Sequence, residues 1–464
     1  MAFSSAADHV FVGFERVLDR AFGARANPLR HLGALGFLLF WVLAASGIVL
    51  FIRFETSAAG AYQSIDDLEW WFGGFARSVH RYAADAFVIV TLAHIAREVA
   101  AGRFRGFRAF SWISGLPALA LLYASGVVGY WLVWDVRSQF SALATAEWFD
   151  ALPFAGGVIA RNFLAREAIV DRLFSLFVFL HLGLPLALLA AMWVHVQRLG
   201  QPRTVAARSL GRGLLAALLV LAWVAPVASL ARWDSQLVPS AIGIDWFLLF
   251  LHPLMYATSP QALWWLAAGA TLVLAALPWL ARTPRLPLAR VDPAHCNGCG
   301  RCVADCPYQA VVLDSTGTAQ VFPERCASCG ICAGACPSST PFRSVRPLVS
   351  GIDLPDLSVH DLRRRLDALL WAGAREVRFR CAAGPALAGA IALRCAAMLP
   401  PSFIEYALRR GARRVALGSC RDGECAWRLG DEIAAARFAA GREPRLRATV
   451  HCERKGNEYS FTLG

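Results

Sequence analysis

The chain has 464 residues, which is too many for one ordinary domain. Hydrophobic residues make up 57% of it and the formal net charge is +13, whereas soluble globular domains are roughly 45–50% apolar. Lys455 is the only lysine, so the excess charge is arginine. Basic chains often bind nucleic acid, but these arginines stand beside long apolar runs, the pattern of membrane topology. The composition therefore excludes a chain made only of ordinary soluble domains, and we expect no nucleic-acid partner.

Charge-free runs long enough to cross a bilayer recur in the first 281 residues. Residues 1–30 come before them and carry charges without an apolar core, so we predict a cytoplasmic amphipathic segment and no signal peptide there. Pro253 and Pro260 interrupt the last run, so its membrane span begins near 261. A six-helix transmembrane bundle is predicted over 31–281, with spans at 31–52, 75–99, 109–134, 173–197, 213–231 and 261–281.

The arginines are distributed unequally between the two sets of connections. One set, together with both ends of the bundle, is arginine-rich, and the other set mixes in acidic residues such as Asp66 and Glu147. Positive charge stays in the cytoplasm, so both termini are predicted to be cytoplasmic in a multi-pass protein of a bacterial inner membrane. The arginines of the cytoplasmic set are Arg16, Arg20, Arg25, Arg30, Arg97, Arg103, Arg105, Arg108, Arg198, Arg203, Arg208, Arg212, Arg282, Arg285 and Arg290.

Four histidines form two pairs with the same spacing. His80 and His94 are fourteen residues apart, and so are His181 and His195. Fourteen helical residues rise ~21 Å and turn the side chain by only ~40°, so each helix offers two imidazoles on nearly one face. Two such helices side by side would bind two haems, each iron taking one histidine from each helix. A single membrane histidine more often packs or lines a pathway, but the duplicated spacing favours haem ligation.

Glycines repeat the same spacing in two other spans. Gly33 and Gly47 lie in the first span, and Gly115 and Gly129 lie in the third. Glycine leaves clearance because it has no side chain, so we expect these positions to face the haem edges. Close helix–helix packing is the alternative use of glycine in membranes.

With these histidines and glycines, residues 25–281 resemble the cytochrome b subunit of quinol-oxidising bc complexes. The resemblance implies two haems b in a six-helix bundle, and a homodimer as in bc-type cytochromes. It also places Arg77 and Arg97, which lie three residues before His80 and three after His94, on the haem propionates. Pro185 matches the kinked fourth helix of that family.

The family places a Pro-Glu-Trp-Tyr motif at its quinol-oxidation site, and the corresponding stretch 244–247 here reads Ile-Asp-Trp-Phe. The resemblance makes Asp245 a candidate quinone-site acid; an interfacial anchor formed by Trp246 beside a charge is the equal alternative. Asp85 is unusual because a carboxylate inside a span is costly. It lies four residues after Arg81, which predicts an ion pair, with a proton relay as the alternative.

All 13 cysteines follow position 295, in tight spacings that indicate metal binding in a reducing compartment. Eight of them form two copies of C-x2-C-x2-C-x3-C followed by proline, the spacing of bacterial two-cluster ferredoxins. In that arrangement the fourth cysteine of each run binds the other cluster, and structural zinc is the alternative. We predict a two-cluster module over 282–345, with one [4Fe–4S] on Cys296, Cys299, Cys302 and Cys336 and the other on Cys306, Cys326, Cys329 and Cys332.

Residues 346–464 are predicted to form a small α/β domain. Strands near 377–379, 393–395 and 414–418 lead into cysteines, and the ends of parallel strands converge at one sheet edge. Residues 370–435 resemble the iron–sulfur delta subunit of hydrogenases that pass electrons to heterodisulfide reductase. In that family the cysteines bind a [2Fe–2S] cluster; zinc or a reactive dithiol pair are the alternatives, and Cys452 lies outside the pattern. The resemblance implies the ligands Cys381, Cys395, Cys420 and Cys425.

Together these features predict a membrane-bound electron-transfer subunit of a quinone-linked oxidoreductase. A cytoplasmic flavoprotein or dehydrogenase would exchange electrons with the [2Fe–2S] cluster, and two [4Fe–4S] clusters and two haems b would connect it to quinone. The alternative is an electron wire and membrane anchor of a larger complex, without a quinone site of its own. No flavin or nucleotide fingerprint is visible in the sequence, so the substrate chemistry is expected on another subunit.

Overall fold

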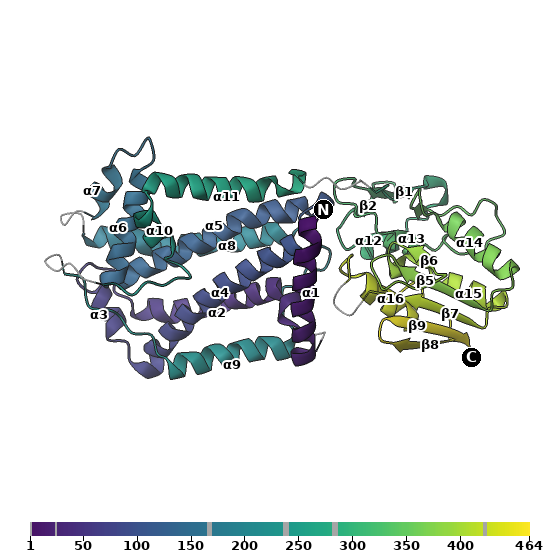
Figure 1. Ribbon diagram of the computed structural model, residues 1–464, viewed down its shortest axis with the longest axis horizontal. Helices are drawn as coiled ribbons and strands as arrows, with labels where there is room; N and C mark the ends of the chain where they lie inside the picture. Colours follow the sequence, from purple (N-terminus) through teal and green to yellow (C-terminus); the bar gives the residue numbers. More distant parts are fainter. Residues whose placement is uncertain (1, 24–25, 165–168, 235–240, 281–285, 421–424) are drawn as a thin grey trace. The chain divides into compact units, whose positions relative to one another are not determined.

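The computed structural model describes residues 2–23, 26–164, 169–234, 241–280, 286–420 and 425–464. Arg25, Arg282 and Arg285, used above for topology, lie outside these ranges, as does the stretch 421–424. The chain divides into two compact units (Figure 1). The first comprises Met1–Arg105, Ala109–Val196 and Arg203–Ala281, and the second comprises Gly106–Arg108, Gln197–Pro202 and Arg282–Gly464.

The first unit is helical. Five long helices coincide with predicted spans, whereas α9 covers only the first part of the span predicted at 213–231 (Figure 1). A further long helix, α1, lies in the segment that precedes the spans, and shorter helices fill the connections. The helices are α1 (Ala2–Phe22), α2 (Leu32–Arg53), α3 (Ala61–Asp66), α4 (Phe75–Ala100), α5 (Ala109–Val133), α6 (Val136–Asp150), α7 (Val158–Leu164), α8 (Asp171–Val196), α9 (Arg208–Val224), α10 (Leu251–Ala257) and α11 (Pro260–Leu280).

Within the described residues, four helices are long and apolar enough to cross a membrane: Leu32–Arg53, Gly106–Val133, Asp171–Val196 and Pro260–Leu280. The helix α4 carries charges along its length, and α9 has 17 residues, so the predicted total of six spans stays a prediction. Helix α2 packs mainly against α4, and α5 packs mainly against α8.

The core of this unit lies at one level of the four central helices. Phe40 of α2, Phe87 of α4, Leu122 of α5 and Leu188 of α8 are all buried in one apolar cluster. Each of these residues is seven positions from both members of the fourteen-residue pair on its own helix. The apolar layer therefore separates the two histidine levels, because each of its residues lies half-way between them along its helix.

The second unit begins with a ferredoxin-type module. Its strands are short, and α12 (Arg301–Ala304) and α13 (Ile331–Ala335) follow the cysteine loops. Strands β2 (Val311–Leu313) and β3 (Ala319–Val321) form a hairpin. Strand β1 (Arg290–Val291) pairs antiparallel with β4 (Ile352–Asp353), so backbone bonds cross the proposed boundary at 345/346, which stays a prediction.

The C-terminal part of this unit contains a five-stranded sheet in the order β6-β5-β7-β9-β8. The parallel strands β5 (Glu376–Cys381) and β7 (Arg414–Gly418) match the predicted ones. Strand β6 (Ile391–Leu393) is parallel to β5 and ends at the first residue of the stretch predicted at 393–395. The strands β8 (Val450–Lys455) and β9 (Glu458–Leu463) add an antiparallel hairpin that the sequence analysis did not predict. The helices of this part are α14 (Val359–Trp371), α15 (Pro401–Arg409) and α16 (Gly430–Phe438).

The sheet buries alternate side chains, as a strand with one face in a core must. In β5 the buried residues are Val377, Phe379 and Cys381. Cys381 ends β5, Cys395 stands two residues after β6, and Cys420 stands two residues after β7. The three parallel strands therefore deliver three cysteines to one edge of the sheet, as predicted.

Candidate functional site

The two histidine-bearing helices place their imidazoles opposite one another in pairs. The ring centroids of His80 and His181 are 6.3 Å apart, and those of His94 and His195 are 6.4 Å apart. First-row metal–imidazole bonds are about 2 Å long, so two imidazoles on opposite sides of one metal ion have centroids roughly 6 Å apart. Each pair thus leaves a gap of the width that a haem iron requires.

Hydrogen bonds at Nδ1 fix the orientation of three of these rings. His181 donates its Nδ1–H to the carbonyl of Ser125 at 3.1 Å. Ser46 Oγ lies 3.0 Å from Nδ1 of His80 and already donates its own proton to the carbonyl of Val42, so it accepts from the ring. With the proton on Nδ1, the other ring nitrogen is free to bind a metal.

His195 has the same arrangement on the other level. Ser114 Oγ donates to the carbonyl of Ser111 and lies 3.2 Å from Nδ1 of His195, so this hydroxyl also accepts from the ring. Ser46 and Ser114 each directly precede one of the repeated glycines. The sequence analysis missed these serines, although their position beside the repeated glycines was the available signal.

Three of the four repeated glycines face a histidine ring. A Cβ atom on Gly47 would lie 3.3 Å from Cε1 of His80, and one on Gly115 would lie 3.2 Å from Cε1 of His195. One on Gly129 would lie only 2.8 Å from Cε1 of His181. At these three positions the glycine makes room for a histidine ring, whereas the sequence analysis expected it to make room for a haem edge. Gly33 has no atom within 4 Å of such a Cβ.

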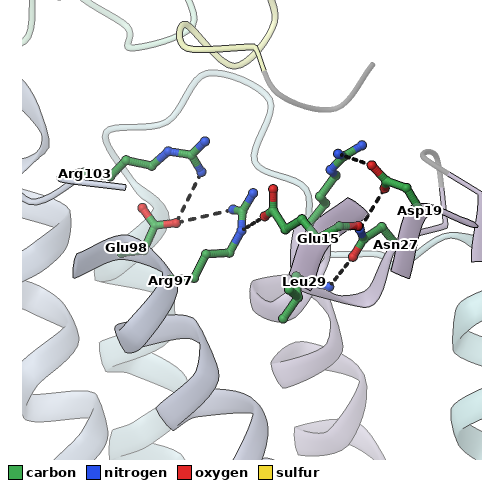
Figure 2. A network of polar contacts seen from close by, with 8 residues as sticks. Glu15, Asp19, Asn27, Leu29, Arg97, Glu98 and Arg103 are labelled. Carbon is green, nitrogen blue, oxygen red and sulfur yellow. Dashed lines mark hydrogen bonds and ion pairs between the residues drawn. The ribbon is translucent and has the colours of Figure 1, made fainter. Parts of the chain in front are cut away.

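The arginines assigned to haem propionates differ in their partners. Figure 2 shows Arg97 in a polar network, where its Nε donates to Glu15 of α1 at 2.8 Å and Nη1 lies 3.7 Å from Glu98. Asn27 anchors the same segment by donating to the backbone carbonyl of Glu15. Arg77 is half-buried on α4 and interacts electrostatically with Asp135. In this structure Arg97 therefore attaches α1 to the helix that carries His94.

Asp245 lies in a buried cluster of charges. Its Oδ2 accepts from Arg81 at 2.6 Å and from the hydroxyl of Tyr130. Arg81 also pairs with Asp85, so the ion pair predicted for Asp85 is confirmed. Tyr130 supplies a hydroxyl to the carboxylate from α5, although the tyrosine of the family motif is replaced by Phe247 here. The sequence gives no sign of this contact because Tyr130 and Asp245 are 115 residues apart.

The cysteines of the ferredoxin-type module surround two hollows in the predicted combinations. Cys296, Cys299, Cys302 and Cys336, the first quartet, line one hollow. Cys306, Cys326, Cys329 and Cys332, the second quartet, line the other. Burial raises the pKa of Cys329 to about 12, so a thiolate there needs a nearby positive charge such as cluster iron. Each hollow fits the predicted cluster by its four sulfur ligands.

The remaining predicted ligands also meet. Sγ of Cys381 lies 3.5 Å from Sγ of Cys420, and the side chain of Cys425 is hydrogen-bonded to those of Cys420 and Cys395. The hydrogen bonds with Cys395 and Cys420 lower the pKa of Cys425, and the hydrogen bond with Cys420 lowers the pKa of Cys381. We call these four residues the C-terminal quartet. Four contiguous sulfurs at the end of a parallel sheet fit a small cluster, whose iron would stabilise all four thiolates.

Three family models match the chain in succession. Cytochrome b/b6/petB matches residues 20–202, the 4Fe-4S dicluster domain matches 295–340, and the methyl-viologen-reducing hydrogenase delta subunit matches 372–454. These matches confirm the three resemblances that the sequence indicated. The chain thus combines a cytochrome b helical region, a ferredoxin-type module and a C-terminal domain with sheets, and it has the character of a transmembrane electron-transfer protein.

Curated relatives cover the helical region. Cytochrome b of Cyanidium caldarium is 26% identical over 232 residues, 49% of this chain and 56% of that protein. The cytochromes b6 of Tupiella akineta and Heterocapsa triquetra are each 29% identical, covering 36% and 39% of this chain and 80% and 85% of those proteins. A solved structure titled Hyperthermophilic respiratory Complex III is 19% identical with a TM-score of 0.45, covering 55% of this chain and 76% of that one.

The clearance at Gly129 makes haem binding testable. We expect Gly129→Val to displace the His181 ring, because even a Cβ atom would approach it to 2.8 Å, and to lower haem b content per chain. Gly269→Val is the matched control, since Gly269 is exposed on α11 with no atom within 4 Å of such a Cβ. The measurement is the haem-to-protein ratio of the purified full-length chain. Full haem content in Gly129→Val would contradict the assignment of His80 and His181.

Proposed function

We propose that this chain is a membrane-bound electron-transfer subunit that links a cytoplasmic redox partner to the quinone pool. Haem and iron–sulfur clusters supply one-electron carriers when bound. In this proposal His80 with His181 and His94 with His195 bind two haems b. The first and second quartets hold two [4Fe–4S] clusters, and the C-terminal quartet holds one [2Fe–2S] cluster.

One observation supports the proposal: the same chain has two histidine pairs whose ring centroids are 6.3 and 6.4 Å apart, and twelve of its cysteines lie in three quartets. A purely structural role for the histidines would not require the repeated Nδ1 bonds and facing glycines, which prepare the other ring nitrogen for a metal. The cytochrome b and dicluster matches support the same cofactors.

The arginine-rich side supports cytoplasmic termini in a bacterial inner membrane. With the C-terminus in the cytoplasm, the C-terminal quartet would be accessible to a cytoplasmic flavoprotein or dehydrogenase subunit that exchanges electrons with it. The match to the hydrogenase delta subunit supports a partner of this class. A homodimer, as in bc-type cytochromes, is part of the proposal.

The buried carboxylate of Asp245 is the proposed quinone-site acid. Its position against Arg81 and Tyr130 supports a group able to accept a proton from a bound quinol on the level of His80. A second candidate function is an electron wire and membrane anchor without a quinone site. It is favoured by the number of protein groups that already bind the carboxylate of Asp245. Asp245 also accepts from the backbone N–H of Phe247 at 2.8 Å, so its oxygens already have structural partners.

An anaerobic quinol reaction tests the proposal. We expect a quinol analogue to reduce the haems of the full-length protein in lipid, and a quinone-site inhibitor to block the change in haem b absorbance. Asp245→Asn should slow this reduction roughly 100-fold, the order expected for loss of a general base. Glu147→Gln is the matched control, because Glu147 also accepts from a tyrosine hydroxyl, that of Tyr256, at 2.6 Å.

The two candidate functions predict different results. If quinol leaves the haems oxidised while a low-potential cytoplasmic donor reduces them, the chain is a wire and anchor. If quinol reduces the haems of Asp245→Asn and Glu147→Gln at the same rate as those of the unaltered protein, the quinone-site role of Asp245 is wrong.

The C-terminal quartet has its own test. Cys420→Ser should remove the [2Fe–2S] signal from the electron paramagnetic resonance (EPR) spectrum and leave both [4Fe–4S] signals, because Cys420 contacts Cys381 and Cys425 but lines neither hollow of the ferredoxin-type module. Cys452→Ser, on β8 outside the quartet, should leave all signals in place. Loss of the [4Fe–4S] signals in Cys420→Ser would contradict the assignment.

A further inference from the structure

The side chain of Arg437 on α16 is completely buried, which is rare for a cation. Its Nη1 donates to the carbonyl of Ala397 at 2.6 Å. Its Nη2 donates to the carboxylate of Asp305 and to the carbonyl of Ile331, the latter at 3.4 Å. A buried guanidinium is costly unless it is paired, so these three contacts hold it in one place.

The three partners of Arg437 belong to cysteine-bearing segments. Asp305 directly precedes Cys306, and Ile331 directly precedes Cys332, both in the second quartet. Ala397 follows Cys395 of the C-terminal quartet by two residues. One guanidinium therefore joins the ligand segments of the second quartet to a ligand segment of the C-terminal quartet.

These segments also pack without intervening side chains. A Cβ atom on Gly334 of α13 would lie 2.1 Å from the carbonyl oxygen of Ala397. One on Gly430 would lie 2.3 Å from Sγ of Cys395 and 3.7 Å from Cδ1 of Ile331. Cys329 and Cys395 belong to the same buried cluster. The second quartet and the C-terminal quartet are thus direct neighbours in one core.

The charges around Arg437 do not cancel. Arg442 also binds Asp305, with Nε donating to Oδ1 at 2.6 Å, so two guanidiniums share one carboxylate. The group has a net charge of +1 when Asp305 is ionised. A positive charge in a low-dielectric interior stabilises added negative charge nearby, and an electron on a cluster is such a charge.

We propose that the second quartet exchanges electrons directly with the C-terminal quartet, and that Arg437 is the positioning residue that fixes their spacing and raises the reduction potentials of both clusters. The inference rests on the proposed function. The step moves one electron: the cluster on one quartet is oxidised by one unit, the cluster on the other is reduced by one, and no bond forms or breaks.

The test is an anaerobic redox titration of the full-length protein followed by EPR. Arg437→Met should shift the midpoint potentials of the C-terminal [2Fe–2S] and the second [4Fe–4S] to more negative values and leave the first [4Fe–4S] unchanged. Asp305 retains Arg442 as a partner in this variant, so no buried carboxylate is left unpaired. Arg437→Lys keeps the positive charge, so it should reverse most of the shift and bring both potentials back towards those of the unaltered protein.

The matched control is Arg447→Met, the same change at a largely exposed arginine that pairs with Glu405 at 3.1 Å. It should leave all three potentials unchanged. Equal shifts in all three clusters of Arg437→Met, or a shift in the first [4Fe–4S] alone, would overturn the proposal. So would a shift in Arg447→Met as large as that in Arg437→Met.

A second measurement does not depend on any arginine variant. In the fully reduced protein, the C-terminal [2Fe–2S] signal should be split by its magnetic neighbour. Cys326→Ser in the second quartet should abolish this splitting, whereas Cys299→Ser in the first quartet should retain it. The reverse pattern, or no splitting, would overturn this proposal alone. Absence of any [2Fe–2S] signal from the unaltered protein would contradict the proposed function itself.

Discussion

The helical unit depends on a shared fourteen-residue repeat in four helices. Two helices supply the imidazoles, and the facing helices supply glycines and carbonyl or hydroxyl acceptors at matching heights. A ring can lie flat against a helix only where no Cβ intervenes, and its Nδ1 bond then directs the other nitrogen into the gap. If α2 or α5 shifted by one residue, the side chains would rotate by about 100° and both levels would lose their fit at once.

The second unit depends on a different constraint, which is the close approach of backbone segments. Gly334 and Gly430 lie where the Cβ atom of any larger residue would clash with the carbonyl oxygen of Ala397 or with Sγ of Cys395. The module that resembles a ferredoxin and the domain that resembles a hydrogenase subunit therefore share one core, in which Cys329 and Cys395 are both buried. Their sequence resemblances point to two separate families, but their packing makes them one body within the second unit.

Local spacing accounts for what could be predicted. The histidine pairs, the cysteine runs and the strands that lead into cysteines each follow from a short local pattern, so the apolar helices, the parallel strands and the first two quartets could be predicted from spacing. The C-terminal quartet was implied by the resemblance to the hydrogenase delta subunit. Contacts between distant residues were not. Tyr130 meets Asp245, and Arg437 meets Asp305, across separations of 115 and 132 residues. Those pairs are set by tertiary packing, which leaves no local signal.

The apolar layer formed by Phe40, Phe87, Leu122 and Leu188 separates the two histidine levels along the helix axes. Fourteen helical residues span ~21 Å of a hydrocarbon core that is about 30 Å thick. An electron that moves between the levels in a bilayer would therefore cross about two thirds of the transmembrane voltage. Each 100 mV then changes its free energy by roughly 1.6 kcal/mol. If each level binds a haem as proposed, the distribution of electrons between the two haems would depend on the membrane potential.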